Sequence, residues 1–378
     1  MIQLRPPFSS LADNEVFAVD ATGAQITVRR PNVAEGVIDV RVEDRVIPIE
    51  LANGVGIATI EGLTPDAPFE IAVLGPDGNV AERLAGTSRP ALTNPTKIAT
   101  ISDVHLGADG FGPARKILDQ SELPYALRCG RSAVDEALAW GAEALIIKGD
   151  LTDTGARDEW LLAERLLEGV DVPVLITSGN HDVWGTREVM PTEGAESIGR
   201  TFDDVQTLDV GPLRIVLVDT SLPGRGWGDL GRHHRRVVDA VDAERPTLLC
   251  LHHHVQRLPA PWFWPPGISP NNATPVLEAV VHKNPFVFLT SGHTHRNRRH
   301  QLLDGNLTFT EVSATSDYPG VWAGYEVTGD VIRQTVRRIA APEATLWTEA
   351  TRAALGTVWP RWSQGRLDDR CVDVQARR

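Results

Sequence analysis

The chain has 378 residues, 42% of them hydrophobic and 23% charged, which is an ordinary globular composition with length enough for two domains. Its formal net charge is −13. This acidity gives no general attraction to nucleic acids or anionic membranes, so we expect neither as a bulk partner.

The N-terminal sequence lacks the basic-then-apolar pattern of a signal peptide, and no apolar run reaches 18 residues. Three cysteines without a C-x-x-C pair do not make a disulfide framework and favour a reducing compartment. We therefore expect a cytoplasmic protein. The sequence leaves a homo-oligomer open.

Residues 1–93 contain short β-like stretches separated by Gly, Pro, Asn and Asp turn signals. The predicted strands are 25–30, 37–42, 56–61 and 69–74. Strands without intervening helices favour a small all-β sandwich domain. The stretch 62–78 resembles the late strands of fibronectin type III-like domains, with Phe69 where many members carry tyrosine.

From residue 94 the pattern changes to apolar strands that alternate with amphipathic helices, predicted at 131–142 and 157–168. Continuous apolar strands predict an α/β domain, which we place at 94–340, with its sheet buried on both faces. The strands are expected at 97–102, 144–149, 174–179, 213–220, 247–252 and 286–292, followed by antiparallel strands within 307–314 and 321–338. Residues 341–378 carry three tryptophans, and we predict a tail that packs on this domain.

Polar side chains follow five of these strands directly. Ligands of open α/β sheets bind beyond the carboxyl ends of the strands, so five strand ends are predicted to deliver donors to one edge. These donors are Asp103 and His105, Asp150 and Asp153, Asn180 and His181, His252, and His293 and His295.

Asp, Asn and His donors without a thiolate suit transition metals such as Mn, Fe or Zn. A carboxylate between two sites can bridge two cations, and Asp150 lies in the middle of the order. Two cations about 3.5–4 Å apart are a usual arrangement for phosphoester hydrolysis. The sequence therefore predicts a dinuclear site and a small phosphoester substrate.

The ordered set D-V-H (103–105), G-D-L-T-D (149–153), G-N-H-D (179–182), His252 and G-H-T-H (292–295) resembles the calcineurin-like metallophosphoesterase signature. All five blocks are intact and in order. The resemblance covers about two-thirds of the chain and implies a four-layer α/β/β/α sandwich for the second domain.

The resemblance also implies roles for individual residues. The first metal would be held by Asp103, His105, Asp150 and His295, and the second by Asp150, Asn180, His252 and His293. His181 would contact the phosphoryl oxygen or protonate the leaving oxygen, and Asp153 would orient it. In the triplet 252–254, His252 is favoured because it ends the strand, and His253 and His254 are left as its neighbours.

Purple acid phosphatases use glycine at the position of His105 and tyrosine at that of Asp153, and this chain has neither. The segment 252–295 is more similar to class III cyclic nucleotide phosphodiesterases, including the pair Asn272-Ala273. Small diesters, with cyclic nucleotides foremost, are therefore the expected substrates. We predict Asn272 and Trp184 as substrate contacts.

Several alternatives stay open. A phosphomonoesterase would use the same ligands, whereas a non-catalytic scaffold would be expected to lack some of them. Asp182 is either a partner of the site or a loop hydrogen bonder. The aromatic cluster 262–264 is a lid over the substrate or, slightly favoured, a surface loop or dimer contact.

Overall fold

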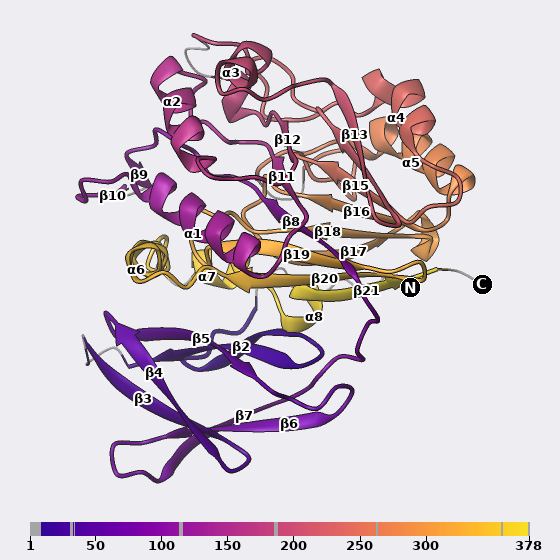
Figure 1. Ribbon diagram of the computed structural model, residues 1–378. Helices are drawn as coiled ribbons and strands as arrows, with labels where there is room; N and C mark the ends of the chain where they lie inside the picture. Colours follow the sequence, from indigo (N-terminus) through magenta and orange to yellow (C-terminus); the bar gives the residue numbers. More distant parts are fainter. Residues whose placement is uncertain are drawn as a thin grey trace.

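The computed structural model describes residues 9–30, 33, 35–112, 116–184, 188–261, 264–356 and 358–376. Its N-terminal part is a seven-stranded antiparallel sheet, at the bottom of Figure 1, with strand order β1-β2-β5-β4-β3-β6-β7. The edge strands β1 and β7 contact each other, so the sheet curls almost into a barrel around its own apolar core. The strands are β1 (Glu15–Val19), β2 (Gly23–Arg29), β3 (Glu35–Val42), β4 (Arg45–Ala52), β5 (Val55–Glu61), β6 (Pro68–Leu74) and β7 (Val80–Thr87).

This part of the chain is all-β, as predicted, although three of its strands were not predicted. β4 contains Pro48, and both β4 and β7 are largely exposed, so neither shows the clear apolar alternation that marks β2 or β3. All seven strands belong to one continuous sheet, so the structure does not show the two separate sheets of the predicted fibronectin type III-like sandwich.

The second domain contains two six-stranded sheets packed face to face (Figure 1). In the first sheet the order is β12-β11-β8-β19-β20-β21, and in the second it is β13-β14-β15-β16-β18-β17. The first comprises β8 (Thr96–Ile101), β11 (Ala144–Lys148), β12 (Val174–Thr177), β19 (Val321–Val327), β20 (Val331–Arg338) and β21 (Cys371–Gln375). The second comprises β13 (Val205–Val210), β14 (Leu213–Val218), β15 (Thr247–Leu251), β16 (Val287–Ser291), β17 (Arg298–Leu302) and β18 (Leu307–Glu311).

Helices cover the outer face of each sheet. Against the first sheet lie α1 (Tyr125–Ala139) and α2 (Arg157–Leu166), and against the second lie α4 (His234–Ala240) and α5 (Pro270–Lys283). The short helix α3 (Pro191–Ser197) packs beside α2. Three apolar clusters separate these layers, which confirms an α/β domain.

The C-terminal segment contains α6 (Pro342–Thr351), α7 (Val358–Ser363) and α8 (Leu367–Arg370), and its last strand, β21, pairs with β20. It therefore extends the first sheet as well as packing on the domain.

One expected strand direction was only half right: β18 is antiparallel to β17 but parallel to β16. An apolar pattern identifies a strand without giving its direction, which tertiary pairing decides. Among the described residues, no helix is long and apolar enough to cross a membrane.

Candidate metal centre

The loops that follow β8, β11 and β12 meet at one edge of the first sheet, because these three strands are parallel neighbours. The loops are tied together by backbone: Asp103 donates its N–H to Gly149 O, and His105 donates its N–H to Asp150 O. The ends of β15 and β16 bring His252 and His293 to the same place from the second sheet. All the predicted donors are therefore gathered where the two sheets meet.

The first group of donors surrounds His295. Its Nε2 lies 3.3 Å from His105 Nε2 and 3.4 Å from Asp103 Oδ1, and the three side chains form one of the clusters able to hold a cation. Burial would raise the pKa of Asp103, but the nearby imidazole of His295 holds it below its usual value. The carboxylate is therefore ionised, as a metal ligand must be.

The second group surrounds His252, which is completely buried. His252 Nε2 lies 3.2 Å from Asn180 Oδ1 and 3.3 Å from Asp150 Oδ2. The same Asp150 oxygen is 3.9 Å from His105 Nε2 in the first group. Asp150 therefore stands between the two groups, the position that the sequence predicted for a bridging carboxylate.

Hydrogen bonds on the far side of the rings fix which nitrogen faces inward. His252 Nδ1 bonds to Lys148 O at 2.8 Å, and His293 Nε2 bonds to Pro266 O at 2.9 Å. A carbonyl oxygen can only accept, so these nitrogens carry the protons. Nε2 of His252 therefore faces the oxygens of Asn180 and Asp150, where it can bind a cation in place of a proton. Imidazole, carboxylate and amide donors of this kind fit a transition metal.

The ligand-bearing backbone is held in an uncommon conformation. Asp103, His105, Asp150, His293 and His295 all have positive φ, between 48° and 70°. The left-handed region costs a side-chain-bearing residue roughly 1–2 kcal/mol, and such residues gather at functional sites. Five strained positions among the seven predicted ligands therefore mark this edge as a site for binding rather than for stability.

Two glycines beside the ligands have no room for a side chain. A Cβ at Gly179 would collide with Asp150 Oδ1, and a Cβ at Gly292 would collide with Ser102 Oγ. The glycines of these blocks are therefore required by the close approach of the backbone to the donors.

His181 lies at the rim of the centre, with 41% of its side chain exposed. Its Nδ1 is 3.0 Å from Asp153 O and 3.3 Å from Asp153 Oδ1, and the same carboxylate oxygen is 3.4 Å from His105 Nδ1. Burial would lower the pKa of His181, but the carboxylates of Asp150 and Asp153 raise it to about 9. Asp153 thus links the predicted acid to a predicted ligand.

Asp182 is a loop hydrogen bonder. Its Oδ1 accepts from the N–H and the hydroxyl of Thr152, and its Oδ2 accepts from the N–H of Gly179. It therefore fastens the loop after β12 to the loop after β11.

The structure adds two residues that the sequence did not single out. His253 is fully buried, bonds through Nδ1 to Thr220 Oγ1 at 2.9 Å, and belongs to a cluster with His252 and His293. Asp317 Oδ2 lies 2.5 Å from His295 Nδ1. The strand pattern marks neither position: it favours His252 and leaves His253 as a neighbour, and Asp317 lies in a loop outside the motif blocks.

The predicted substrate contacts are placed less directly. Trp184 is 46% exposed, just past His181, and its ring lies beside Gly226. The side chain of Asn272 accepts from the N–H groups of Leu230 and Gly231 and donates to Asp229, so it supports that loop. Of the aromatic cluster 262–264, Trp264 is exposed, and the other two positions lie outside the described residues.

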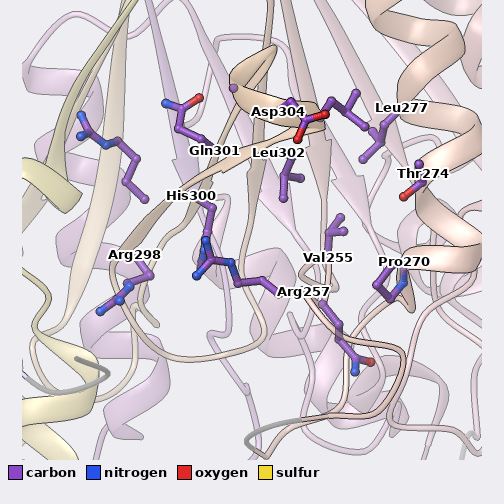
Figure 2. Close-up of a pocket in the computed structure, with 14 residues that line it drawn as sticks. Val255, Arg257, Pro270, Thr274, Leu277, Arg298, His300, Gln301, Leu302 and Asp304 are labelled. Atoms are coloured by element: carbon purple, nitrogen blue, oxygen red, sulfur yellow. The ribbon is translucent and has the colours of Figure 1, made fainter. Parts of the chain in front are cut away.

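A separate pocket of about 510 Å³ lies between β17, α5 and the chain that follows the histidine triplet. Figure 2 shows Arg257 and His300 among its lining residues, with Pro270 and Thr274 of α5. None of the predicted metal ligands lines it, so this pocket is distinct from the metal centre.

Fold and site together define a metal-dependent hydrolase. Residues 96–297 match the model of the calcineurin-like phosphoesterases, and the chain belongs to that family. Membership of the family implies a site for two metal ions.

Three relatives are named phosphodiesterases. A probable cyclic nucleotide phosphodiesterase of Rhodococcus erythropolis is 33% identical over 162 residues, which is 40% of this chain and 50% of that protein. The 3',5'-cyclic adenosine monophosphate phosphodiesterase CpdA of Pseudomonas aeruginosa is 29% identical over 41% of this chain and 54% of its own length. The glycerophosphodiester phosphodiesterase GpdQ of Enterobacter lignolyticus is 26% identical over 45% of this chain and 58% of its own length. The chain thus spans between 50% and 58% of the length of these relatives.

Proposed function

We propose that the chain is a dinuclear metal-dependent phosphodiesterase of small diesters, with cyclic nucleotides as the leading substrate class. The observation that carries the proposal is the complete set of Asp, Asn and His donors around Asp150, which stands between two groups of inward-facing imidazoles. The names of the three relatives support diesters over monoesters.

Each predicted ligand has a defined task in this proposal. Asp103, His105 and His295 would hold one cation, Asn180, His252 and His293 the other, and Asp150 would touch both. Mn, Fe and Zn all suit these donors. When bound, the cations supply Lewis acidity toward phosphoryl oxygens and the activation of water at neutral pH.

His181 is proposed as the general acid. Its Nδ1 is hydrogen-bonded to Asp153. Its Nε2 is therefore the nitrogen that would give a proton to the alcohol oxygen that leaves phosphorus. The carboxylates of Asp150 and Asp153 stabilise the protonated ring, since together they raise the pKa of His181 to about 9. A proton is therefore held at this rim at neutral pH, as a general acid requires.

Substrate positioning is proposed for two residues. Trp184 follows His181 closely in the sequence and is half-exposed, and we propose that its ring contacts the organic part of the ester. Asn272 is proposed to act through the loop at 229–231 that it holds, rather than by touching substrate. A cytoplasmic location and a homo-oligomer remain predictions.

The test compares hydrolysis of bis-p-nitrophenyl phosphate, p-nitrophenyl phosphate, cyclic AMP and a glycerophosphodiester by the Mn²⁺-loaded chain. We expect faster hydrolysis of the diester than of the monoester analogue, with cyclic AMP cleaved among the natural esters. A variant of the exposed His234 should retain these rates and serves as the control. Faster monoester hydrolysis would favour the phosphomonoesterase alternative, and no hydrolysis by the metal-loaded chain would contradict the proposal.

A further inference from the structure

The C-terminal segment, beyond the residues that match the family, is bonded to the surroundings of the metal centre through three indole N–H groups. Trp347 donates to Ser316 O at 2.7 Å, Trp359 donates to Asp317 Oδ1 at 3.2 Å, and Trp362 donates to Thr294 O at 3.0 Å. Asp317 contacts the ring of His295 directly. Ser316 precedes Asp317 in the sequence, and Thr294 precedes His295. Three indoles of one segment therefore converge on the surroundings of a single ligand.

Asp317 is the residue that joins the segment to the ligand. It is completely buried, with one carboxylate oxygen on His295 Nδ1 at 2.5 Å and the other accepting the N–H of Trp359. A carboxylate behind a ligating histidine fixes the orientation of the ring and increases its basicity. The indole of Trp359 in turn fixes the carboxylate, because a bond to each oxygen prevents the group from rotating.

The helix that carries Trp359 is anchored independently of this bond. Asn297 donates its backbone N–H to Ser363 O at 2.9 Å, and its side chain donates to Gln364 O at 3.2 Å. The guanidinium of Arg296 lies 4.1 Å from the centre of the Trp362 ring. The loss of a single indole N–H at position 359 should therefore leave α7 in place.

We propose that Trp359 is a positioning residue for the first metal, acting through Asp317 on the ring of His295. The inference rests on the dinuclear centre proposed above and assigns a role to a segment outside residues 96–297. The ring of Trp359 also lies 5.0 Å from that of Phe111 and 6.0 Å from that of His295, so phenylalanine would preserve most of its packing.

The experiment titrates the metal-free chain with Co²⁺ and follows both heat and the visible absorption of the bound ion. The variants are Trp359→Phe, Asp317→Asn and, as a matched control, Trp140→Phe. Trp140 lies beside Lys97 at the start of β8, whereas Asp103 follows the end of that strand. Thermal unfolding of each metal-free variant is recorded so that a loss of fold is detected separately.

In the wild type we expect two binding events. Trp359→Phe should weaken one of them by about 10-fold and Asp317→Asn by up to about 100-fold, the range found for groups that support metal ligands. The absorption of that Co²⁺ ion should change in both variants, with the other event unaltered and Trp140→Phe like the wild type. Wild-type affinity and spectrum in the Trp359→Phe and Asp317→Asn chains would overturn this inference alone. A wild-type chain that binds no metal would overturn the dinuclear centre together with it.

Discussion

Asp150 Oδ2 lies 3.3 Å from His252 Nε2 and 3.9 Å from His105 Nε2, so one carboxylate oxygen stands between histidines from the two groups of donors. His252 directly follows a strand of the second sheet, and Asp150 follows a strand of the first. The centre therefore depends on how the two sheets pack, and it cannot exist in either sheet alone.

Replacement of Asp150 should affect both cations. We expect Asp150→Asn to bind neither metal firmly, because it removes the charge that the two groups share, and to lose at least about 100-fold in rate. Metal content by elemental analysis, compared with the exposed Asp135→Asn, provides the measurement. Retention of full metal content by Asp150→Asn would show that this residue is not the bridge.

The histidine triplet can be resolved by two single variants. His252→Ala should lose about one metal per chain, because its Nε2 faces Asn180 and Asp150. His253→Ala should keep both, because the Nδ1 of His253 is bonded to Thr220 and it is predicted as a neighbour only. Metal content of the two purified chains decides the matter, and the reverse pattern would move the ligand to His253.

Replacement of His181 should reduce the rate of catalysis without removing the metals. His181→Ala is expected to retain both metals but to lose about 10²–10⁴-fold in kcat on a diester, the usual contribution of a general acid. Asp153→Asn should cause a smaller loss, since it supports the ring without transferring the proton. The loss should shrink for an ester whose leaving group needs no proton, such as a nitrophenolate. An equal loss on both kinds of ester would argue against acid catalysis by His181.

Glu349 should make the stability of the chain depend on acid pH. It accepts from Arg29 of the N-terminal domain at 3.0 Å and from Arg338 at 2.7 Å. Burial would raise its pKa, but these two guanidinium groups lower it from 4.5 to about 2. Because the pKa is lower in the folded chain, the stabilisation is complete above pH 4.5 and is lost as the pH falls toward 2.

We therefore expect Glu349→Gln to lower the free energy of unfolding by about 3 kcal/mol at pH 7 and by clearly less at pH 3. Urea unfolding of the metal-free chain at the two pH values measures this difference. The Glu70→Gln variant, which alters an exposed ion pair with Arg83, should change little at either pH. If Glu349→Gln lowered the free energy of unfolding equally at pH 7 and pH 3, the stabilisation would not come from the negative charge of Glu349.

The gathering of the donors at one edge could be predicted because each one lies in the loop just after a buried strand, where the apolar run gives way to Asp, Asn or His. Their role as metal ligands stays a prediction. The packing of two sheets against each other could not be derived from periodicity alone, because an apolar strand does not reveal its neighbour. It was expected only through the family resemblance. Asp317 was missed for a related reason: nothing in its loop marks it, and only the fold brings it to His295.

In the β domain the strands with regular alternation were predicted, whereas β4 and β7 depend on pairing with their neighbours. The tail was predicted to pack on the domain, but neither its last strand nor its indole bonds follow from three tryptophans in a sequence. The substrate contact that the resemblance suggested for Asn272 stays a prediction, and its side chain is hydrogen-bonded to the loop at 229–231.

The central claim is that the donors around Asp150 hold two cations. Elemental analysis of the reconstituted chain, alongside the diester hydrolysis rate of the same sample, tests it most directly. We predict about two transition-metal ions per chain and a rate that rises with occupancy and disappears on chelation. A chain with one ion or none after reconstitution, or a rate independent of metal content, would contradict it.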